Sequence, residues 1–465
     1  MVKKLEQALS AIVGEGQVFA GAEIDERYKT DLTRKYSSEP AYVVRPASTE
    51  HVAAIVKLAA ETGTPVTALS GRTGVVGGGV AVNGGIVLSL ERMNSIVEID
   101  TASMTMTVEA GCVLQTVQEA AEAEGAFLPL DLGARGSAMI GGVIATNAGG
   151  NRVVRWGMMR DMVIGLEAVL ADGTVVSSLT KMLKDNAGYN WKHLLIGSEG
   201  TLAIITRAVL RLRPLPTSSQ TAIVAVDNFE DVITVLRRLE AGLSGRLSSF
   251  ELMWESFYQC ITEANLPQRP RPLPSGSPFY ALVEALGSNA EDDAAQFQRE
   301  LEKVMETGLI TDAVIASSER EREGLWAVRE EMELGLAGCR PFYSFDVSMA
   351  LAAMPAFSVA AEKNLRQVYP NASVMFYGHA GDGNLHAIVS VGEAGKEVQK
   401  AVDTAIFDAV RDVGGSIAAE HGIGQSRAPF LEWTRSAEEL ALMKMLKKAL
   451  DPNNILNPGR LLDTK

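Results

Sequence analysis

Three stretches rich in glycine and other small residues interrupt the first 215 residues of this 465-residue chain, among short runs with strand character. They cover residues 70–79, 129–151 and 197–206. Because glycine has no Cβ, backbone amides in such loops can turn inward and approach a ligand closely. Long runs of small residues also let the backbone press against a large, flat ligand. The stretches therefore predict an α/β region built around a cofactor.

The first of these loops, Ser70-Gly-Arg-Thr-Gly, directly follows a run with strand character at 66–69. Its glycines suit the binding of a pyrophosphate. The loop matches neither G-x-G-x-x-G nor the nucleoside-triphosphate pattern that ends in Gly-Lys-Ser/Thr, which disfavours the common dinucleotide and ATP folds. Taken alone, it is equally consistent with a plain flexible glycine turn.

Periodicity predicts alternating strands and helices up to about residue 215. A helix is expected over 52–61 with Thr49 as its cap, and a hairpin over 168–179 with its turn at Asp172-Gly173. Further strands are expected at 41–45, 66–69, 85–90, 104–109 and 202–212.

A stretch with two prolines and two serines, at 214–220, predicts a domain boundary. Beyond it the rhythm returns, with strands expected at 221–226 and 279–285 and helices at 229–241, 290–306 and 438–450. A proline-rich stretch at 266–277 is expected to be a surface loop. We thus expect domains over residues 1–215, 216–430 and 431–465.

Composition restricts the class of protein. Hydrophobic residues make up 47% and charged residues 22%, as in a well-packed globular protein, and the net charge is −14. Such an acidic chain lacks the general basic field that nucleic acid binding requires. The three cysteines are far apart and form no CxxC pair, which favours a reducing compartment. With no run of 18 apolar residues for a transmembrane span and no apolar core typical of a signal peptide, a cytoplasmic location is expected.

The whole chain has only five histidines, and three of them lie late in the sequence. His379 and His386 lie in Gly-His-Ala-Gly-Asp-Gly-Asn-Leu-His, and His421 follows Glu420. A hairpin over 374–391 would bring the first two side by side, and a strand over 416–419 would deliver Glu420 and His421. Two imidazoles and a carboxylate form the ligand set of an open metal site. Whichever of Glu420 and His421 is left over could then act as a base.

The ordered set of loops resembles the flavoprotein family of vanillyl-alcohol oxidase and p-cresol methylhydroxylase. The resemblance rests on Gly71–Gly74, on Ala-Thr-Asn-Ala-Gly-Gly at 145–150 and on Ser-Glu-Gly-Thr at 198–201. It implies FAD, and noncovalent FAD, because Arg72 and Thr73 stand where some relatives carry a flavin-linked histidine. The cofactor-binding residues implied are Ser70, Gly71, Arg72, Thr73, Gly74, Pro129, Asp131, Gly133, Gly141, Gly142, Ala145, Thr146, Asn147, Gly150, Glu199, Gly200 and Ile204.

The histidine motifs resemble those of the FAD-dependent D-2-hydroxy-acid dehydrogenases, the group of D-lactate, glycolate and D-2-hydroxyglutarate enzymes. Both Gly-His-x-Gly-Asp-Gly-Asn-x-His and Glu-His-Gly-Ile-Gly match. The resemblance implies that His379, His386 and Glu420 bind a divalent metal ion, that His421 is the base beside the flavin, and that Asn457 returns to the flavin.

The implied fold is α+β, with a two-subdomain FAD-binding domain of the vanillyl-alcohol oxidase type. A mixed α/β substrate domain with a central sheet and a C-terminal helical segment complete it. The chemistry is coherent: a metal lowers the pKa of the substrate hydroxyl, a histidine takes its proton, and FAD takes the hydride.

Arg329 matches the family's arginine for the substrate carboxylate, a task that suits a guanidinium. A solvated helix arginine is the alternative, because three glutamates lie near it in the sequence. Two positions depart from the family. Ser344 stands near the place of a frequent lysine, and Ile388 stands where hydroxyglutarate enzymes tend to carry asparagine. Both differences argue against a dicarboxylate substrate and favour a smaller or more apolar 2-hydroxy acid.

Several alternatives stay open at this level. An oxidase that uses O₂ directly would carry the same motifs, a metallohydrolase could use the same two histidines and glutamate, and a non-catalytic FAD-binding module is a third option. Zinc is the first choice of metal, with manganese or iron as alternatives. The electron acceptor (an electron-transfer flavoprotein, a quinone or a cytochrome) is not written in the sequence. The oligomeric state is also open, with a homodimer among the options.

Overall fold

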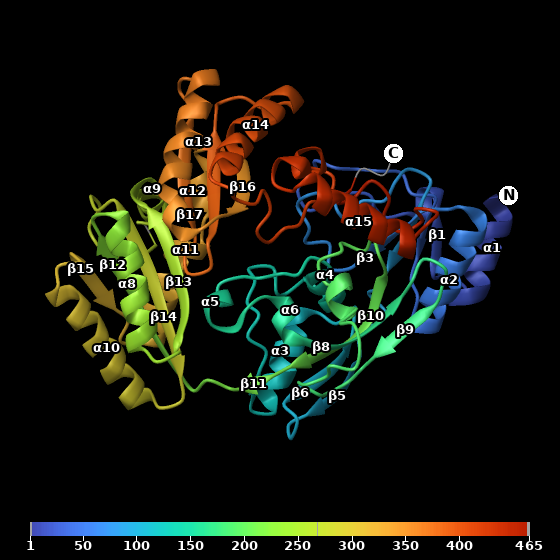
Figure 1. The fold of residues 1–465 in the computed structure, drawn as a ribbon, viewed down its shortest axis with the longest axis horizontal. Helices are drawn as coiled ribbons and strands as arrows, with labels where there is room; N and C mark the ends of the chain where they lie inside the picture. The colour runs from blue at the N-terminus through green and yellow to red at the C-terminus, as the bar shows by residue number, and fades with distance from the viewer. Residues whose placement is uncertain (1, 267, 463–465) are drawn as a thin grey trace. The chain divides into compact units, whose positions relative to one another are not determined.

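The computed structural model describes residues 2–266 and 268–462, and the chain forms two compact units. The first unit comprises the residues up to 149, 158–215 and those from 420 onward. The second comprises 150–157 and 216–419. In Figure 1 the strands of the first unit run from blue to green, and those of the second from yellow-green to orange.

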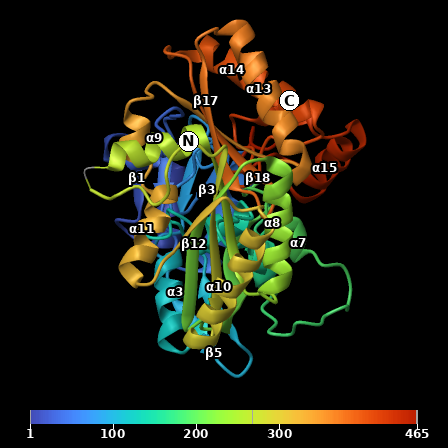
Figure 2. The ribbon, with the colours of Figure 1, turned by 90° about the vertical axis from the view of Figure 1, so that its left-hand side faces the viewer.

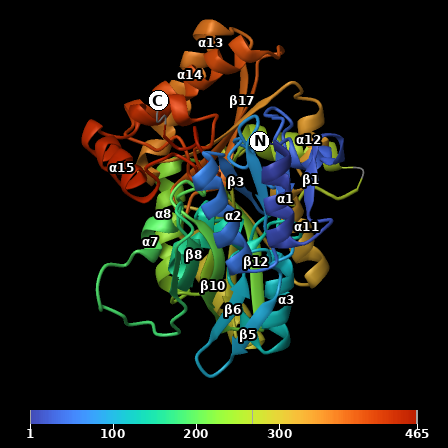
Figure 3. The ribbon, with the colours of Figure 1, turned by 90° about the vertical axis from the view of Figure 1, so that its right-hand side faces the viewer.

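A four-stranded sheet forms the N-terminal part of the first unit, in the order β1-β2-β4-β3. Strand β1 is antiparallel to β2, and β4 is parallel to both β2 and β3. Helices α1 and α2 lie side by side next to this sheet (Figure 3). The elements are α1 (Val2–Val13), β1 (Val18–Ala20), β2 (Tyr42–Val44), α2 (Thr49–Thr62), β3 (Val66–Leu69) and β4 (Ile86–Ser89).

The N-cap of α2 differs from the predicted one. Ser48 Oγ accepts a hydrogen bond from the His51 amide at 3.3 Å, so Ser48 is the cap and Thr49 is the first helical residue. Thr49 is buried and donates instead to Glu167 Oε1 at 2.6 Å. A partner 118 residues away in the sequence therefore takes its hydroxyl.

A five-stranded antiparallel sheet forms the rest of the first unit, in the order β5-β6-β10-β8-β9. The predicted hairpin is confirmed as β8–β9, and Gly173 in its turn has φ +86°. The strands are β5 (Ile96–Asp100), β6 (Thr105–Glu109), β8 (Val163–Val169), β9 (Val175–Ser178) and β10 (Ile204–Arg211), and β7 (Ala126–Phe127) pairs with β11 (Arg213–Pro214). The helices are α3 (Leu114–Ala123), α4 (Ile140–Ala145), α6 (Met159–Met162) and α7 (Lys192–Leu195).

The second unit is built on a seven-stranded antiparallel sheet in the order β15-β12-β14-β13-β17-β18-β16. Figure 2 shows α8 and α10 on one side of this sheet, with α9 and α11 on the other. The strands are β12 (Ser218–Val226), β13 (Leu247–Trp254), β14 (Phe279–Gly287), β15 (Asp312–Ile315), β16 (Tyr343–Ser348), β17 (Ser373–His379) and β18 (Asn384–Ser390). The helices are α5 (Val153–Trp156), α8 (Phe229–Gly242), α9 (Glu255–Asn265), α10 (Ala290–Glu306), α11 (Glu319–Glu330), α12 (Glu333–Ala337), α13 (Met354–Val368) and α14 (Lys396–Asp412).

The segment that carries Glu420 and His421 is not preceded by the predicted strand. Ser416 forms an isolated bridge with Ser348, and no strand continues from it. The last predicted helix is confirmed as α15 (Ala437–Leu450), whose N-terminus has a capping box of Ser436 and Glu439. Within the described residues, no helix combines the length and apolar character needed to cross a bilayer.

Candidate active site

The three small-residue loops, which belong to the first unit except for residues 150 and 151, lie against one another. Ser70 Oγ accepts a hydrogen bond from the Gly142 amide at 3.2 Å, which joins the first loop to the second. The Glu199 amide donates to the Ala145 carbonyl at 2.8 Å, which joins the second loop to the third. Loops far apart in the sequence therefore form one surface.

Glycine has two distinct uses in these loops. A Cβ on Gly71 would collide with the backbone of residues 137–139, and a Cβ on Gly141 would collide with Ala110. Both glycines are therefore needed for close packing of protein against protein. Gly74 differs, because a Cβ there would meet no protein atom within 4 Å.

The first loop fits a phosphate-binding role. Among the described residues, no backbone amide from residue 71 to 76 donates to a protein acceptor. A run of unpaired amides in a glycine-rich turn is the arrangement that binds a pyrophosphate. Arg72 lies within it at φ +58°, and Asn147 and Glu199 in the other two loops have φ +50° and +52°. Left-handed conformations of non-glycine residues concentrate at functional sites.

The remaining predicted cofactor residues have varied surroundings. Asp131 forms an ion pair with Arg135 at 2.9 Å, and Thr146 Oγ1 donates to the Gly142 carbonyl at 3.1 Å. Ile204 opens β10 and is buried, whereas Gly150 belongs to the second unit. Pro129 and Gly133 lie between β7 and α4, and Gly200 follows Glu199 at φ +69°.

Asn457 ties the C-terminal segment to the loops of the first unit. Its Nδ2 donates to the carbonyls of Gly78 at 3.0 Å and Glu199 at 2.8 Å. Its Oδ1 accepts from Thr67 Oγ1 at 3.1 Å. The buried amide side chain therefore has three protein partners, and it connects the end of the chain with two of the three loops.

Glu199 also holds the segment that begins with His421. Its two carboxylate oxygens accept from the amides of Ile423 at 2.7 Å and Gly424 at 2.8 Å. Burial raises the pKa of Glu199, and these two backbone hydrogen bonds counteract part of that effect. Gly422 packs against the same carboxylate at φ +80°. One side chain of the third loop thus fixes the chain beside His421.

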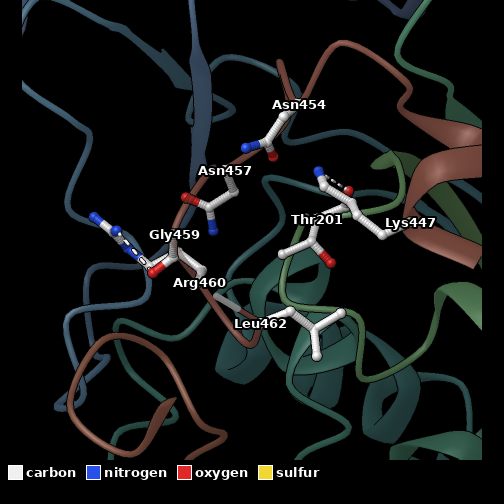
Figure 4. A pocket seen from close by; sticks show the side chains of 7 residues that line it. All are labelled: Thr201, Lys447, Asn454, Asn457, Gly459, Arg460 and Leu462. Atoms are coloured by element: carbon white, nitrogen blue, oxygen red, sulfur yellow. Dashed lines mark hydrogen bonds between the residues drawn. The ribbon is translucent and has the colours of Figure 1, made fainter. Parts of the chain in front are cut away.

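A small pocket lies where the C-terminal segment meets the third loop (Figure 4). Lys447 donates there to the carbonyls of Thr201 and Leu456, each at 2.8 Å, and to Asp451 Oδ2 at 2.5 Å. Burial lowers the pKa of Lys447, and Asp451 opposes that shift. The pocket is lined by Thr201, Lys447, Asn454, Asn457, Gly459, Arg460 and Leu462.

In the second unit, the predicted histidine hairpin is confirmed. Strands β17 and β18 pair antiparallel, and the rings of His379 and His386 lie with centroids 5.3 Å apart. Tyr377 lies opposite His386 in the register, with its ring 4.9 Å from the imidazole. Both histidines are buried.

A buried carboxylate that the sequence analysis did not identify lies beside these histidines. Glu251 on β13 is opposite His379 on β17, and its Oε1 is 2.6 Å from His379 Nδ1. Its Oε2 accepts from Arg329 Nε at 2.9 Å. Burial disfavours the charged form, but the charges and hydrogen bonds of His379 and Arg329 outweigh it and hold the pKa of Glu251 below its ordinary value. The signal was present in the sequence: a single glutamate interrupts the apolar run of β13.

Arg329 is not the solvated helix residue of the alternative hypothesis. It is 6% exposed, and its guanidinium carbon lies 4.6 Å from the centre of the Tyr377 ring. Its Nε donates a hydrogen bond to Glu251 Oε2. Among the described residues, its two Nη atoms have no hydrogen-bond partner.

The three predicted metal-binding residues come together. Each of His379, His386 and Glu420 offers one ligand atom, and these atoms lie within 4.8 Å of one another. His379 is the last residue of β17, His386 lies within β18, and Glu420 directly follows Ala419, the last residue of the second unit. Two imidazoles and one carboxylate suit zinc, and they also suit iron or manganese.

Two protein-family models match the chain. The model described as "FAD linked oxidases, C-terminal domain" matches residues 215–461, and the one described as "FAD binding domain" matches 40–178. A D-2-hydroxyglutarate dehydrogenase of Xanthomonas citri pv. viticola is 39% identical over 445 residues, which is 94% of this chain and 93% of the relative. The mitochondrial D-2-hydroxyglutarate dehydrogenase of Bos taurus is 37% identical, over 98% of this chain and 83% of its own.

Solved structures share the fold. p-Cresol methylhydroxylase with bound substrate has a TM-score of 0.75 and 16% identity, over 98% of this chain and 96% of its own. An alkyldihydroxyacetonephosphate synthase also has a TM-score of 0.75, with 17% identity over 98% of this chain and 84% of its own. The expected α+β fold of the vanillyl-alcohol oxidase type is confirmed.

Proposed function

This chain belongs to the family of FAD-linked D-2-hydroxy-acid dehydrogenases, and we propose that it oxidises a D-2-hydroxy acid without a distal carboxylate to the 2-oxo acid. The observation that carries the proposal is the attachment of the His421 segment to the third loop by Glu199. It puts a candidate base in the same unit as the loops that match the FAD-binding model.

The residues of this chain have separate tasks in the proposed reaction. When bound, FAD accepts the hydride and a divalent metal ion lowers the pKa of the substrate hydroxyl. His421 accepts the hydroxyl proton, a step worth about 10²–10⁴ in rate. The two Nη atoms of Arg329 hold the substrate carboxylate, while Glu251 occupies Nε. His379, His386 and Glu420 hold the metal ion, with zinc as the first choice.

The loops of the first unit hold noncovalent FAD in this proposal. The amides of residues 71–76 bind the pyrophosphate, and the small-residue stretch of the second loop lies against the rest of the cofactor. Arg72 and Thr73 offer no nucleophilic imidazole for a covalent link. Asn457 supports the third loop through a hydrogen bond to the carbonyl of Glu199.

The substrate part of the proposal rests on two side chains of the second unit. The relatives named above are D-2-hydroxyglutarate dehydrogenases, whose substrate has a second carboxylate. This chain has Ser344 and Ile388 where a lysine and an asparagine are frequent in such enzymes. Ile388 is 3% exposed and belongs to an apolar cluster with Met375 and Tyr377, which favours a small or apolar substrate tail.

Electrons leave the flavin for an external acceptor, for which an electron-transfer flavoprotein, a quinone or a cytochrome is proposed. A cytoplasmic location and a homodimer remain predictions. An oxidase that uses O₂ is the competing proposal, and the rate of flavin reoxidation in air separates the two.

The test is anaerobic mixing of the purified protein with D- and L-forms of lactate, malate, 2-hydroxyglutarate, mandelate and longer 2-hydroxy acids, before and after chelation. We expect one monocarboxylic D-acid to bleach the flavin absorbance, and chelation to abolish the bleaching. Preference for 2-hydroxyglutarate would overturn the substrate assignment alone. Bleaching that survives chelation would overturn the metal role, and no bleaching by any acid would overturn the reaction.

A further inference from the structure

We infer that Glu251 is a positioning residue that fixes the imidazole of His379 for metal binding and holds Arg329 with the same carboxylate. The inference rests on the proposed metal site and adds a residue to it. Glu251 is fully buried, and each of its two carboxylate oxygens has a charged or polar partner of its own.

The register of the sheet sets this contact. Glu251 and His379 are directly opposite one another at the end of the pairing between β13 and β17. Side chains of opposite residues project from the same face of a sheet. Two residues further along each strand, Met253 lies opposite Tyr377, whose ring packs on Arg329. The contact is therefore built by strand pairing and does not depend on a mobile loop.

The hydrogen bond decides which nitrogen of His379 binds a metal ion. An imidazole that binds a metal ion is neutral and carries one proton, and a carboxylate accepts but does not donate. Glu251 therefore keeps the proton on Nδ1, 2.6 Å from Oε1, and leaves the lone pair of Nε2 for the metal. A carboxylate partner also raises the basicity of the ligand nitrogen.

Because of Arg329, an amide at position 251 cannot replace the carboxylate as the acceptor for His379. The guanidinium only donates, so Oε2 of residue 251 must accept from Nε. In Glu251→Gln the single amide oxygen goes to the cation, and the NH₂ group then faces His379 Nδ1. That donor forces the imidazole proton onto Nε2, the atom proposed to bind the metal ion. We expect one substitution to weaken the metal site without removing any of its ligands.

The test uses FAD-loaded protein stripped of metal, with Zn²⁺ affinity measured by competition with a chromogenic chelator. Glu251→Gln is expected to weaken Zn²⁺ binding by roughly 10–100-fold. The matched control is Glu284→Gln. Glu284 is a second buried glutamate of the same sheet, on β14, with partners Ser248 and Trp326 rather than a histidine. We expect its Zn²⁺ affinity to equal that of the wild type.

A double variant separates positioning from general support of the fold. In Glu251→Gln/Arg329→Met the cation is gone, so the amide oxygen is free to accept from His379 Nδ1–H. Zn²⁺ affinity should return to within a few-fold of the wild type, even if the single variant does not fold. Equal affinity of wild type and Glu251→Gln, or no recovery in the double variant, would overturn the inference. Absence of Zn²⁺ binding by the wild type would instead overturn the proposed metal site.

Discussion

Ser344 and Ile388 are direct partners across the antiparallel pairing of β16 and β18, although 44 positions separate them in the sequence. Two residues further along each strand, Asp346 lies opposite His386. Because side chains two residues apart on a strand share a face, both positions lie on the face that carries His386. The two departures from the family pattern therefore form one local change.

The first prediction follows from this pairing. Ser344→Lys/Ile388→Asn supplies a cation and an amide, and we expect kcat/KM for D-2-hydroxyglutarate to rise relative to D-lactate by about 10–100-fold. This corresponds to about 1.5–3 kcal/mol for a hydrogen bond to a charged group. Steady-state kinetics with both acids checks it. Ser344→Met/Ile388→Val, which matches size without polarity, should leave the ratio unchanged, and an equal gain there would refute the explanation.

Removal of the proposed base should separate chemistry from cofactor binding. In His421→Asn we expect the rate of flavin reduction by the substrate to fall about 10²–10⁴-fold. FAD content should stay at the wild-type level, because Glu199 holds the backbone of residues 423 and 424 rather than the imidazole. Stopped-flow absorbance at saturating substrate measures the rate. A reduction rate within a few-fold of the wild type would assign the base elsewhere.

Gly71 and Gly74 form a matched pair for testing the first loop. Gly71→Ala places a methyl group against the backbone of residues 137–139, so we expect loss of apoprotein stability by at least about 1–3 kcal/mol. In Gly74→Ala the methyl group meets no protein atom within 4 Å, so apoprotein stability should not change. Urea unfolding of the two apoproteins gives the comparison. Equal stability of the two variants would mean that the loop moves freely.

The buried ion pair of Lys447 and Asp451 anchors the C-terminal segment. Lys447→Met leaves the 2%-exposed Asp451 without its counter-ion, and we expect a loss of about 3–5 kcal/mol in the free energy of unfolding. Lys447→Met/Asp451→Asn should be more stable than the single variant, because it buries no unpaired charge. Denaturant unfolding followed by flavin fluorescence measures both. A double variant that is no better than the single one would show that the lost hydrogen bonds of Lys447, not the charge, set the cost.

Cys112 predicts a pH dependence of stability. Burial raises the pKa of its thiol from 9.0 to about 11. The folded state binds the thiol proton more tightly than the unfolded state does. The stabilisation that comes from this proton is therefore complete below pH 9 and is lost as the pH rises through about 11. We expect the stability gap between wild type and Cys112→Ala to be constant up to about pH 9 and to narrow above it, by up to about 2–3 kcal/mol.

Urea unfolding with a reductant at pH 7 to 10.5 checks this dependence. Cys260, whose thiol pKa is also raised to about 11 by burial, is present in both proteins, so its contribution cancels. A gap that stays constant to pH 10.5 would contradict the assignment.

Local patterns in the sequence predicted much of this protein. The strand and helix periods, the hairpin turn at Asp172-Gly173, and the closeness of His379 and His386 across the turn at 380–383 all depend on neighbours in the chain. The small-residue loops were visible for the same reason. Their order along the chain was enough to indicate the flavoprotein fold.

Only the tertiary structure decided which side chains that are distant in the sequence form hydrogen bonds or ion pairs with one another. Thr49 is not the predicted cap, because its hydroxyl donates to Glu167. In place of the strand predicted before Glu420, Ser416 forms only an isolated bridge with Ser348. Glu251 became the partner of His379 and Arg329 through the alignment of β13 with β17. Strand register and helix packing are non-local, and a shift of one residue would turn Glu251 to the other face of the sheet. The sequence by itself therefore indicates which side chains can react, whereas the register of the sheet determines which side chains they contact.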